Sequence, residues 1–222
     1  KKLKRLRKAR KPKKQRYPIT LERQFESQIR RMVAFIQKDV NLYLKPRIDS
    51  LLLDSEQRND DYSSDITGIL GQLDSLGQQR FRTESFDDIA NRIGADVSTF
   101  NRSEFQKVIK SVIGVNIFKN EPWLNAELDT FSEEATSYIT KLSDDTIREV
   151  GRLTRDGVKN GVRAETIAKD LSKQFGISRN RASLIARDQI GKLNGQLTKR
   201  RQQSVGIEEY KWRNSQDSRV VG

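Results

Sequence analysis

The sequence predicts a mostly α-helical protein, with an extended multi-helix body and a small α+β region at its C-terminus that contains at least one strand near 207–213. Three observations predict this class. Apolar residues recur at helical spacing over long stretches, only 34% of the residues are hydrophobic while 33% are charged, and the mean hydropathy is −0.78. So few apolar residues cannot fill one large core. We therefore expect long amphipathic helices, some of which protrude or pack on partners.

The first element is a basic arm, residues 1–16, which we expect to be flexible. It contains eleven Lys or Arg and no acid, so the other 206 residues carry only +2 of the net charge of +13. Such a segment can neutralise phosphates with little sequence preference, or bind an acidic protein surface. A solvated tail or a membrane-surface patch is the alternative. The candidate binding residues are Lys1, Lys2, Lys4, Arg5, Arg7, Lys8, Arg10, Lys11, Lys13, Lys14 and Arg16.

A helical N-terminal region is expected at residues 17–112. Thr20 is placed to cap a first helix of about five or six turns that stops near Pro46. We interpret it as a packing helix, with docking on a partner as the alternative. The polar residues 54–65 predict a loop, and three shorter helices should follow, with apolar positions within 66–76, 85–93 and 100–112.

A second region is expected at residues 113–222. It opens with a brief apolar segment, 113–118, that predicts either a strand or an extended linker. A helix should follow Pro122, and Ser143 with the two Asp after it should start another helix. Gly161 is placed to end that helix.

The stretch from Gly161 to Arg213 predicts two helices and a strand. The first helix should end at Gly176, and Ser178 is placed to cap the second, which Gly206 ends. The second helix carries an apolar stripe of Ala182, Ile185, Ala186, Ile190, Leu193 and Leu197. The strand is indicated by the alternation of aromatic and charged residues in Glu209, Tyr210, Lys211, Trp212 and Arg213.

The run RASLIARDQIGKLNGQ, followed closely by VGIEEYKWRNSQDSRV, resembles the signature of the phage head morphogenesis family, the minor capsid proteins similar to protein F of phage Mu. The resemblance extends from about Val115 to the end. Family members usually continue into a segment that contains His, whereas this chain ends at Gly222 without one, so we expect a domain truncated at its C-terminus. The matching positions are Arg181, Ala182, Ile185, Ala186, Arg187, Asn194, Gly206, Trp212, Asp217, Arg219 and Val220.

Seven of these positions are candidates for an interface or a structural motif. The alternative for Arg187 is an ordinary charge on a helix surface, and Trp212 suits a core or interface position better than a ligand platform. Asn194 followed by Gly195 has low helix propensity, which indicates a packing constraint. The seven candidates are Arg181, Ala182, Arg187, Asn194, Trp212, Asp217 and Arg219.

The composition argues against catalysis. The absence of Cys and His excludes disulfides, the usual zinc sites and histidine-based catalysis. The acidic pairs are adjacent in sequence, so on a helix they diverge by about 100° and cannot share one metal ion unaided. No apolar run approaches the roughly 18 residues that span a bilayer. We therefore expect no enzyme activity, no catalytic residue, no cofactor, no metal and no membrane.

The resemblance implies a minor capsid protein of a tailed phage. Such a protein would associate with the portal vertex or the capsid interior during head assembly, in several copies per particle. Its partners would be the portal protein, the major capsid protein or both, and the arm would contact packaged DNA. It would be found in the virion head near the portal vertex and be assembled in the host cytoplasm. The alternative is a sequence-nonspecific nucleic-acid-binding module that uses the arm for affinity and the helix at 178–201 for contact.

Overall fold

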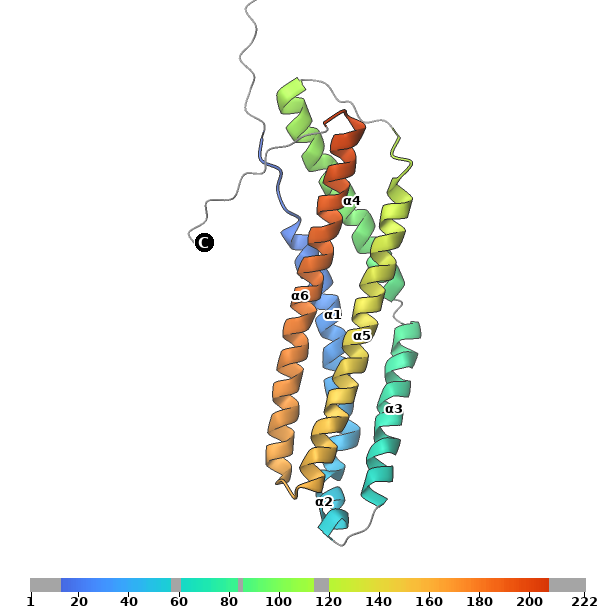
Figure 1. Cartoon of the computed structure of the whole chain (residues 1–222), viewed down its shortest axis with the longest axis vertical. Helices are drawn as coiled ribbons and strands as arrows, with labels where there is room; N and C mark the ends of the chain where they lie inside the picture. The colour runs from blue at the N-terminus through green and yellow to red at the C-terminus, as the bar shows by residue number, and fades with distance from the viewer. Residues whose placement is uncertain (1–12, 57–60, 84–85, 114–119, 208–222) are drawn as a thin grey trace, which may run out of the picture.

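The computed structural model describes residues 13–56, 61–83, 86–113 and 120–207, and this part of the chain is all-α. The helices form a long bundle (Figure 1). A π-helical turn, Val40–Leu44, and a 3-10 turn, Lys45–Arg47, connect the first two α-helices. The α-helices are α1 (Ile19–Asp39), α2 (Ile48–Glu56), α3 (Asp61–Thr83), α4 (Phe86–Ile113), α5 (Leu124–Lys159) and α6 (Ala164–Ser204).

The long helices α5 and α6 form an antiparallel hairpin, and α1 packs against α6 (Figure 1). Helices α3 and α4 follow one another along α5, as the positions of two glycines show. Gly151 of α5 lies against Leu70 of α3, and Gly94 of α4 lies against Phe131 of α5. The bundle therefore resembles a four-helix arrangement at most levels along its length, although one of its four columns is divided between two helices.

One continuous apolar core runs along the bundle. Near its middle the rings of Phe25 in α1 and Phe131 in α5 lie 6.0 Å apart between centroids. The core contains residues from both sides of residue 113, where the domain boundary is predicted. The division into two domains stays a prediction. In α6 the predicted stripe is buried at Ala182, Ala186, Ile190, Leu193 and Leu197.

The predicted α+β region is wrong for the described residues, which contain no strand. At Ile207 the chain closes a helix instead. Gly206 has a φ of +77° and donates its N–H to the carbonyl of Gln203, while Ile207 donates to the carbonyl of Gln202. These two bonds form a Schellman cap. The remaining residues of the predicted strand, including Trp212, lie outside the described residues.

The predicted breaks at Ser143 and at Gly176 are also wrong, because α5 and α6 run through them without interruption. Ser178 is buried, and its hydroxyl lies 2.9 Å from that of Thr146 in α5, so it makes a contact between helices rather than a cap. Packing of the hairpin therefore outweighs the cost of about 1 kcal/mol of placing Gly176 inside a helix. The predicted end at Gly161 is confirmed, since its φ is +61° and it completes a second Schellman cap.

The N-terminal region also differs from its prediction. Thr20 does not cap α1, which begins one residue earlier after Pro18 without a side-chain cap. Most of the predicted loop at 54–65 is helical, because α2 continues to Glu56 and α3 begins at Asp61. The two predicted helices at 85–93 and 100–112 are one helix, α4, since Gly94 allows α4 to approach Phe131 closely instead of ending a helix.

Candidate functional site

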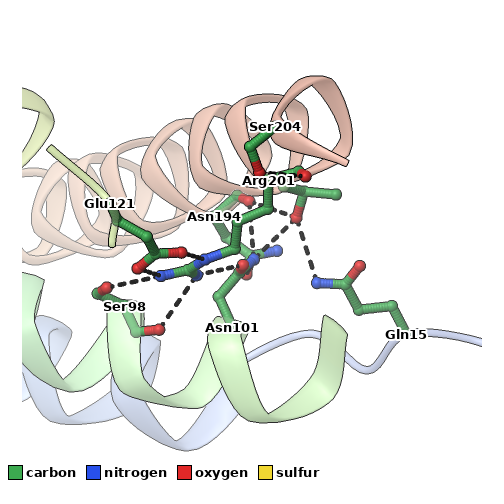
Figure 2. Close-up of polar contacts among 8 residues, drawn as sticks. Gln15, Ser98, Asn101, Glu121, Asn194, Arg201 and Ser204 are labelled. Carbon is green, nitrogen blue, oxygen red and sulfur yellow. Dashed lines mark hydrogen bonds and ion pairs between the residues drawn. The ribbon is translucent and has the colours of Figure 1, made fainter. Parts of the chain in front are cut away.

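A buried polar cluster lies at the end of the bundle where α4, α6 and the start of α5 converge (Figure 2). At its centre is Arg201, whose side chain is fully buried. Its guanidinium donates to both carboxylate oxygens of Glu121, at 2.7 and 3.0 Å, and to the carbonyl and hydroxyl of Ser98, at 3.2 and 3.0 Å. A fifth bond, of 2.6 Å, reaches Asn101 Oδ1, and the ring of Trp123 lies 5.8 Å from the guanidinium carbon. The charge of Arg201 is therefore fully paired inside the protein.

Asn101 extends this cluster across α6 to the N-terminal segment. Its amide donates to the side-chain oxygen of Asn194 at 2.8 Å and to the hydroxyl of Thr198 at 2.8 Å. The same hydroxyl accepts a bond of 3.2 Å from Gln15 Nε2 (Figure 2). We call this set of residues, from Glu121 through Arg201, Ser98, Asn101, Asn194 and Thr198 to Gln15, the Arg201 network. A connected, satisfied polar network in a core holds helices in one register, because every alternative register leaves polar groups unpaired.

The last residues of the arm are held at the same end. Arg16 donates to Glu104 of α4 from its backbone N–H at 3.3 Å and from its guanidinium at 3.1 and 2.8 Å. Lys107 donates to the same carboxylate at 2.7 Å. These hydrogen bonds, from Arg16 first and Lys107 second, lower the pKa of the Glu104 carboxyl to about 2. Farther along α4, the hydroxyl of Ser111 accepts a bond from the backbone of Lys13.

Of the predicted binding residues in the arm, Lys13, Lys14 and Arg16 are described and all three are exposed. The structure therefore places three of the arm's cations at the end of the bundle that carries the Arg201 network. The others lie outside the described residues, and these are Lys1, Lys2, Lys4, Arg5, Arg7, Lys8, Arg10 and Lys11.

The structure separates the motif residues that the resemblance singled out. Asn194 belongs to the Arg201 network, and Ala182 is fully buried in the core. Arg181 is exposed on α6 and bonds Asp145 of α5 at 2.9 Å, whereas the exposed Arg187 contributes its backbone carbonyl to the hydroxyl of Tyr17. The three remaining motif residues, Trp212, Asp217 and Arg219, lie outside the described residues.

Arg201 was not among the site residues predicted from the sequence. Three cations in a row at 199–201 have a simple local explanation, because positive charges are favourable at a helix C-terminus. One signal was present, because Arg201 follows Leu193 and Leu197 at four-residue steps and so falls on the buried stripe of α6. The partners Ser98, Asn101 and Glu121 carried no comparable signal, since contacts made across about a hundred residues leave no local pattern.

Two further features are absent from the described part of the chain. Among those residues, no group of three or more carboxylates is arranged so that it could hold a metal ion. In the same residues, no helix is both long enough and apolar enough to cross a bilayer.

Residues 148–221 match the family model described as "Phage Mu protein F like protein". The C-terminal third of this chain is thus Mu F-like. The predicted resemblance is confirmed over these residues, which we call the Mu F-like region. The region contains the end of α5 and all of α6, including Asn194 and Arg201.

A longer relative supports a relationship beyond the Mu F-like region. An uncharacterized protein of Haemophilus influenzae is 24% identical over 199 residues, which cover 88% of this chain. The aligned part is 44% of that protein, so this chain spans less than half the length of the relative it matches. No solved structure matches the chain.

Proposed function

We propose that this protein is a minor head protein of a tailed phage, which associates with the portal vertex or the capsid interior while the head assembles. The observation that carries the proposal is the Mu F-like match over residues 148–221. In this proposal several copies enter each head, assembly takes place in the host cytoplasm, and the protein remains in the virion near the portal vertex.

The outer face of α6 is the proposed docking surface for the portal protein or the major capsid protein. Ile177 and Leu184 are 54% and 48% exposed, and a separation of seven residues places them on one face of the helix. Arg181, one of the motif residues, lies between them in sequence and is also exposed. Neighbouring apolar side chains on a helix surface suit a contact with another protein. The location of this face in the Mu F-like region supports its use in assembly.

The basic arm is the proposed contact with packaged DNA. The helix at 178–201 is a weaker candidate, because its main cations are already occupied. Lys192 pairs with Glu134, Arg200 pairs with Glu127, and Arg201 is buried. By contrast, Lys13 and Lys14 are exposed, and in the sequence they directly follow residues 1–12, which contain eight further Lys or Arg. This difference also favours the arm in the second candidate function, a sequence-nonspecific nucleic-acid-binding module.

We propose a structural role rather than a catalytic one. The carboxylates of Glu121 and Glu104 are buried, and each pairs with an arginine from a distant segment of the chain. Arg201 with Glu121 and Arg16 with Glu104 join residues that are 80 and 88 positions apart in the sequence, and each arginine satisfies the charge of its partner. Such pairs hold elements in place.

The assembly role is tested by incorporation into particles. The phage is grown without its own copy of the gene, and the full-length protein is supplied as wild type, as Ile177→Asp/Leu184→Asp, or as a control, Leu42→Asp/Leu53→Asp. The control changes two equally exposed leucines outside α6, at 58% and 59% exposure. We expect mass spectrometry of purified procapsids to detect the wild type and the control but not the α6 variant. Absence of the wild-type protein from procapsids and virions would refute the role, and equal incorporation of both variants would refute the α6 surface.

A further inference from the structure

A groove of about 440 Å³ opens where α3 and the start of α4 meet the middle of α5. Its polar lining consists of three carboxylates, an amide and hydroxyls, which come from all three helices. These residues include Asp74 and Gln78 of α3, Asp87 of α4, and Thr136, Ser143 and Asp144 of α5. The groove thus combines three carboxylates with apolar side chains such as Phe86 and Ile147, and it lies far from the Arg201 network along α5.

The negative charge of this groove is not compensated within the described part of the chain. Asp74 accepts a bond from Gln78 at 2.9 Å and Asp87 accepts one from Thr136 at 2.7 Å, and both donors are neutral. No ion pair joins either carboxylate, or that of Asp144, to a described cation. The position of Asp87 in the first turn of α4 is explained by the helix dipole, but Asp74 and Asp144 lie inside their helices and have no such explanation.

A second observation also points to a missing ligand. Ser143 lines the groove and is only 2% exposed, and no hydrogen bond joins its hydroxyl to a described residue, so the hydroxyl is open to the groove rather than sealed in the core. A hydroxyl can both donate and accept, so this one can bond a ligand that enters the groove. The described carboxylates form no group that could hold a metal ion, whereas a Lys or Arg side chain supplies both a positive charge and hydrogen-bond donors for them.

The chain supplies such a cation in residues 1–12, which contain eight Lys or Arg. The direction of residues 13–16 argues against binding of the arm to the groove of its own chain. From Arg16 to Lys13 the chain passes along α4 from Glu104 to Ser111, which leads away from Asp87. The helix rises about 36 Å between Asp87 and Ser111. Twelve residues span at most about 40 Å when fully extended, so the arm would have to reverse and stretch completely to reach its own groove.

We infer that the groove between α3, α4 and α5 binds the Lys- and Arg-rich residues 1–12 of a second copy of this chain. The contact is head-to-tail, because the arm at the end of one bundle enters the side of another. Contacts of this kind continue from copy to copy until a ring closes or a filament grows. The inference needs neither DNA nor a phage particle, so it can fail while the proposed assembly function stands.

The first test is self-association of the purified full-length chain, free of nucleic acid, measured by sedimentation velocity over a range of concentrations. Asp74→Asn/Asp144→Asn removes two charges from the groove without changing side-chain size. The matched control, Asp156→Asn/Asp188→Asn, removes two exposed charges elsewhere. We expect association of the wild type and of the control, and association at least ~10-fold weaker for the groove variant. A monomeric wild type, or an equal effect of the two variants, would overturn the inference.

The second test identifies the two surfaces. Equal amounts of unlabelled and ¹⁵N-labelled full-length chains are mixed and treated with a zero-length reagent that joins amines to carboxylates. We expect linked peptides that pair lysines of residues 1–12 with Asp74, Asp87 or Asp144 in mixed-isotope form, and their loss in 0.5 M salt, where charge pairs are screened to within about 4 Å. Links found only within chains of one isotope, or links that avoid the groove, would overturn the inference.

Discussion

Arg201 and Glu121 form a two-bond ion pair whose side chains are 0% and 7% exposed, and this pair joins the end of α6 to the segment that leads into α5. It closes the α5–α6 hairpin at the end opposite its turn, because the turn lies at Gly161, whereas Arg201 lies in the last turn of α6 and Glu121 lies just before α5. Ser98 and Asn101 then connect the pair to α4. One guanidinium therefore aligns three segments that are distant in the sequence.

Replacing Arg201 should be strongly destabilising. Arg201→Met leaves Glu121 buried and unpaired, and the loss of one partner of a buried ion pair costs about 3 to 5 kcal/mol. The control Arg200→Gln breaks an exposed pair with Glu127 and should cost less than about 1 kcal/mol. Urea unfolding followed by circular dichroism measures both. Similar costs for the two variants would show that the Arg201 network does not stabilise the fold.

Glu104 should make stability depend on acid pH. Its pKa is lowered to about 2 in the folded protein, whereas the usual value is 4.5. The stabilisation that it supplies is therefore complete above about pH 4.5 and is lost as the pH falls towards 2. We expect the difference in urea midpoint between the wild type and Glu104→Gln to be constant near neutral pH and to shrink below pH 4.5. The exposure of Arg16 limits its size, since solvent screens the pair. A difference that grows on acidification would contradict this account.

Removal of residues 1–12 should greatly weaken duplex DNA binding while leaving the bundle intact. The deletion spares Lys13, Gln15 and Arg16, which bond Ser111, Thr198 and Glu104. We expect affinity at 50 mM salt to fall at least ~100-fold and the slope of log K against log salt to become shallower, because fewer phosphates are neutralised. Fluorescence anisotropy with a labelled duplex measures both quantities. In Lys192→Gln/Arg200→Gln the affinity should stay within about threefold of wild type, and a large loss there would assign DNA binding to α6.

Two glycines of the hairpin should respond oppositely to alanine. A Cβ at Gly157 would lie 2.7 and 2.8 Å from Ile167, which is itself buried, so Gly157→Ala should cost about 1 to 3 kcal/mol. Gly195 lies in α6 with nothing within 4 Å of its Cβ position, so Gly195→Ala should stabilise the protein by about 0.5 to 1 kcal/mol. Thermal unfolding of both variants tests the packing of α5 on α6. Destabilisation by Gly195→Ala would show an undetected contact on that face.

The features that the sequence predicted correctly are local ones. The apolar stripe of α6 from Ala182 to Leu197 is buried, and the helices end at Gly161 and Gly206. A stripe repeats every few residues, and a glycine at a cap is selected by the backbone conformation of that one position. Both signals are therefore complete within about ten residues of sequence.

Tertiary structure decided that the helices continue through Ser143, Gly176 and Gly94. It also decided which residue pairs with Arg201. A serine before two aspartates, or a glycine in a helix, is compatible with an end or with continuation, and only the neighbouring helix decides between them. Ser178 shows this, because the hydroxyl that fits a cap bonds Thr146 across the hairpin instead. The same holds for Arg201, whose charge can be buried only because α4 and Glu121 bring five hydrogen-bond acceptors to it. Periodicity and capping thus determined that the chain forms helices, whereas contacts between distant segments decided how long each helix is and which charges are buried, since the free energy of those contacts exceeds the local preference for a break.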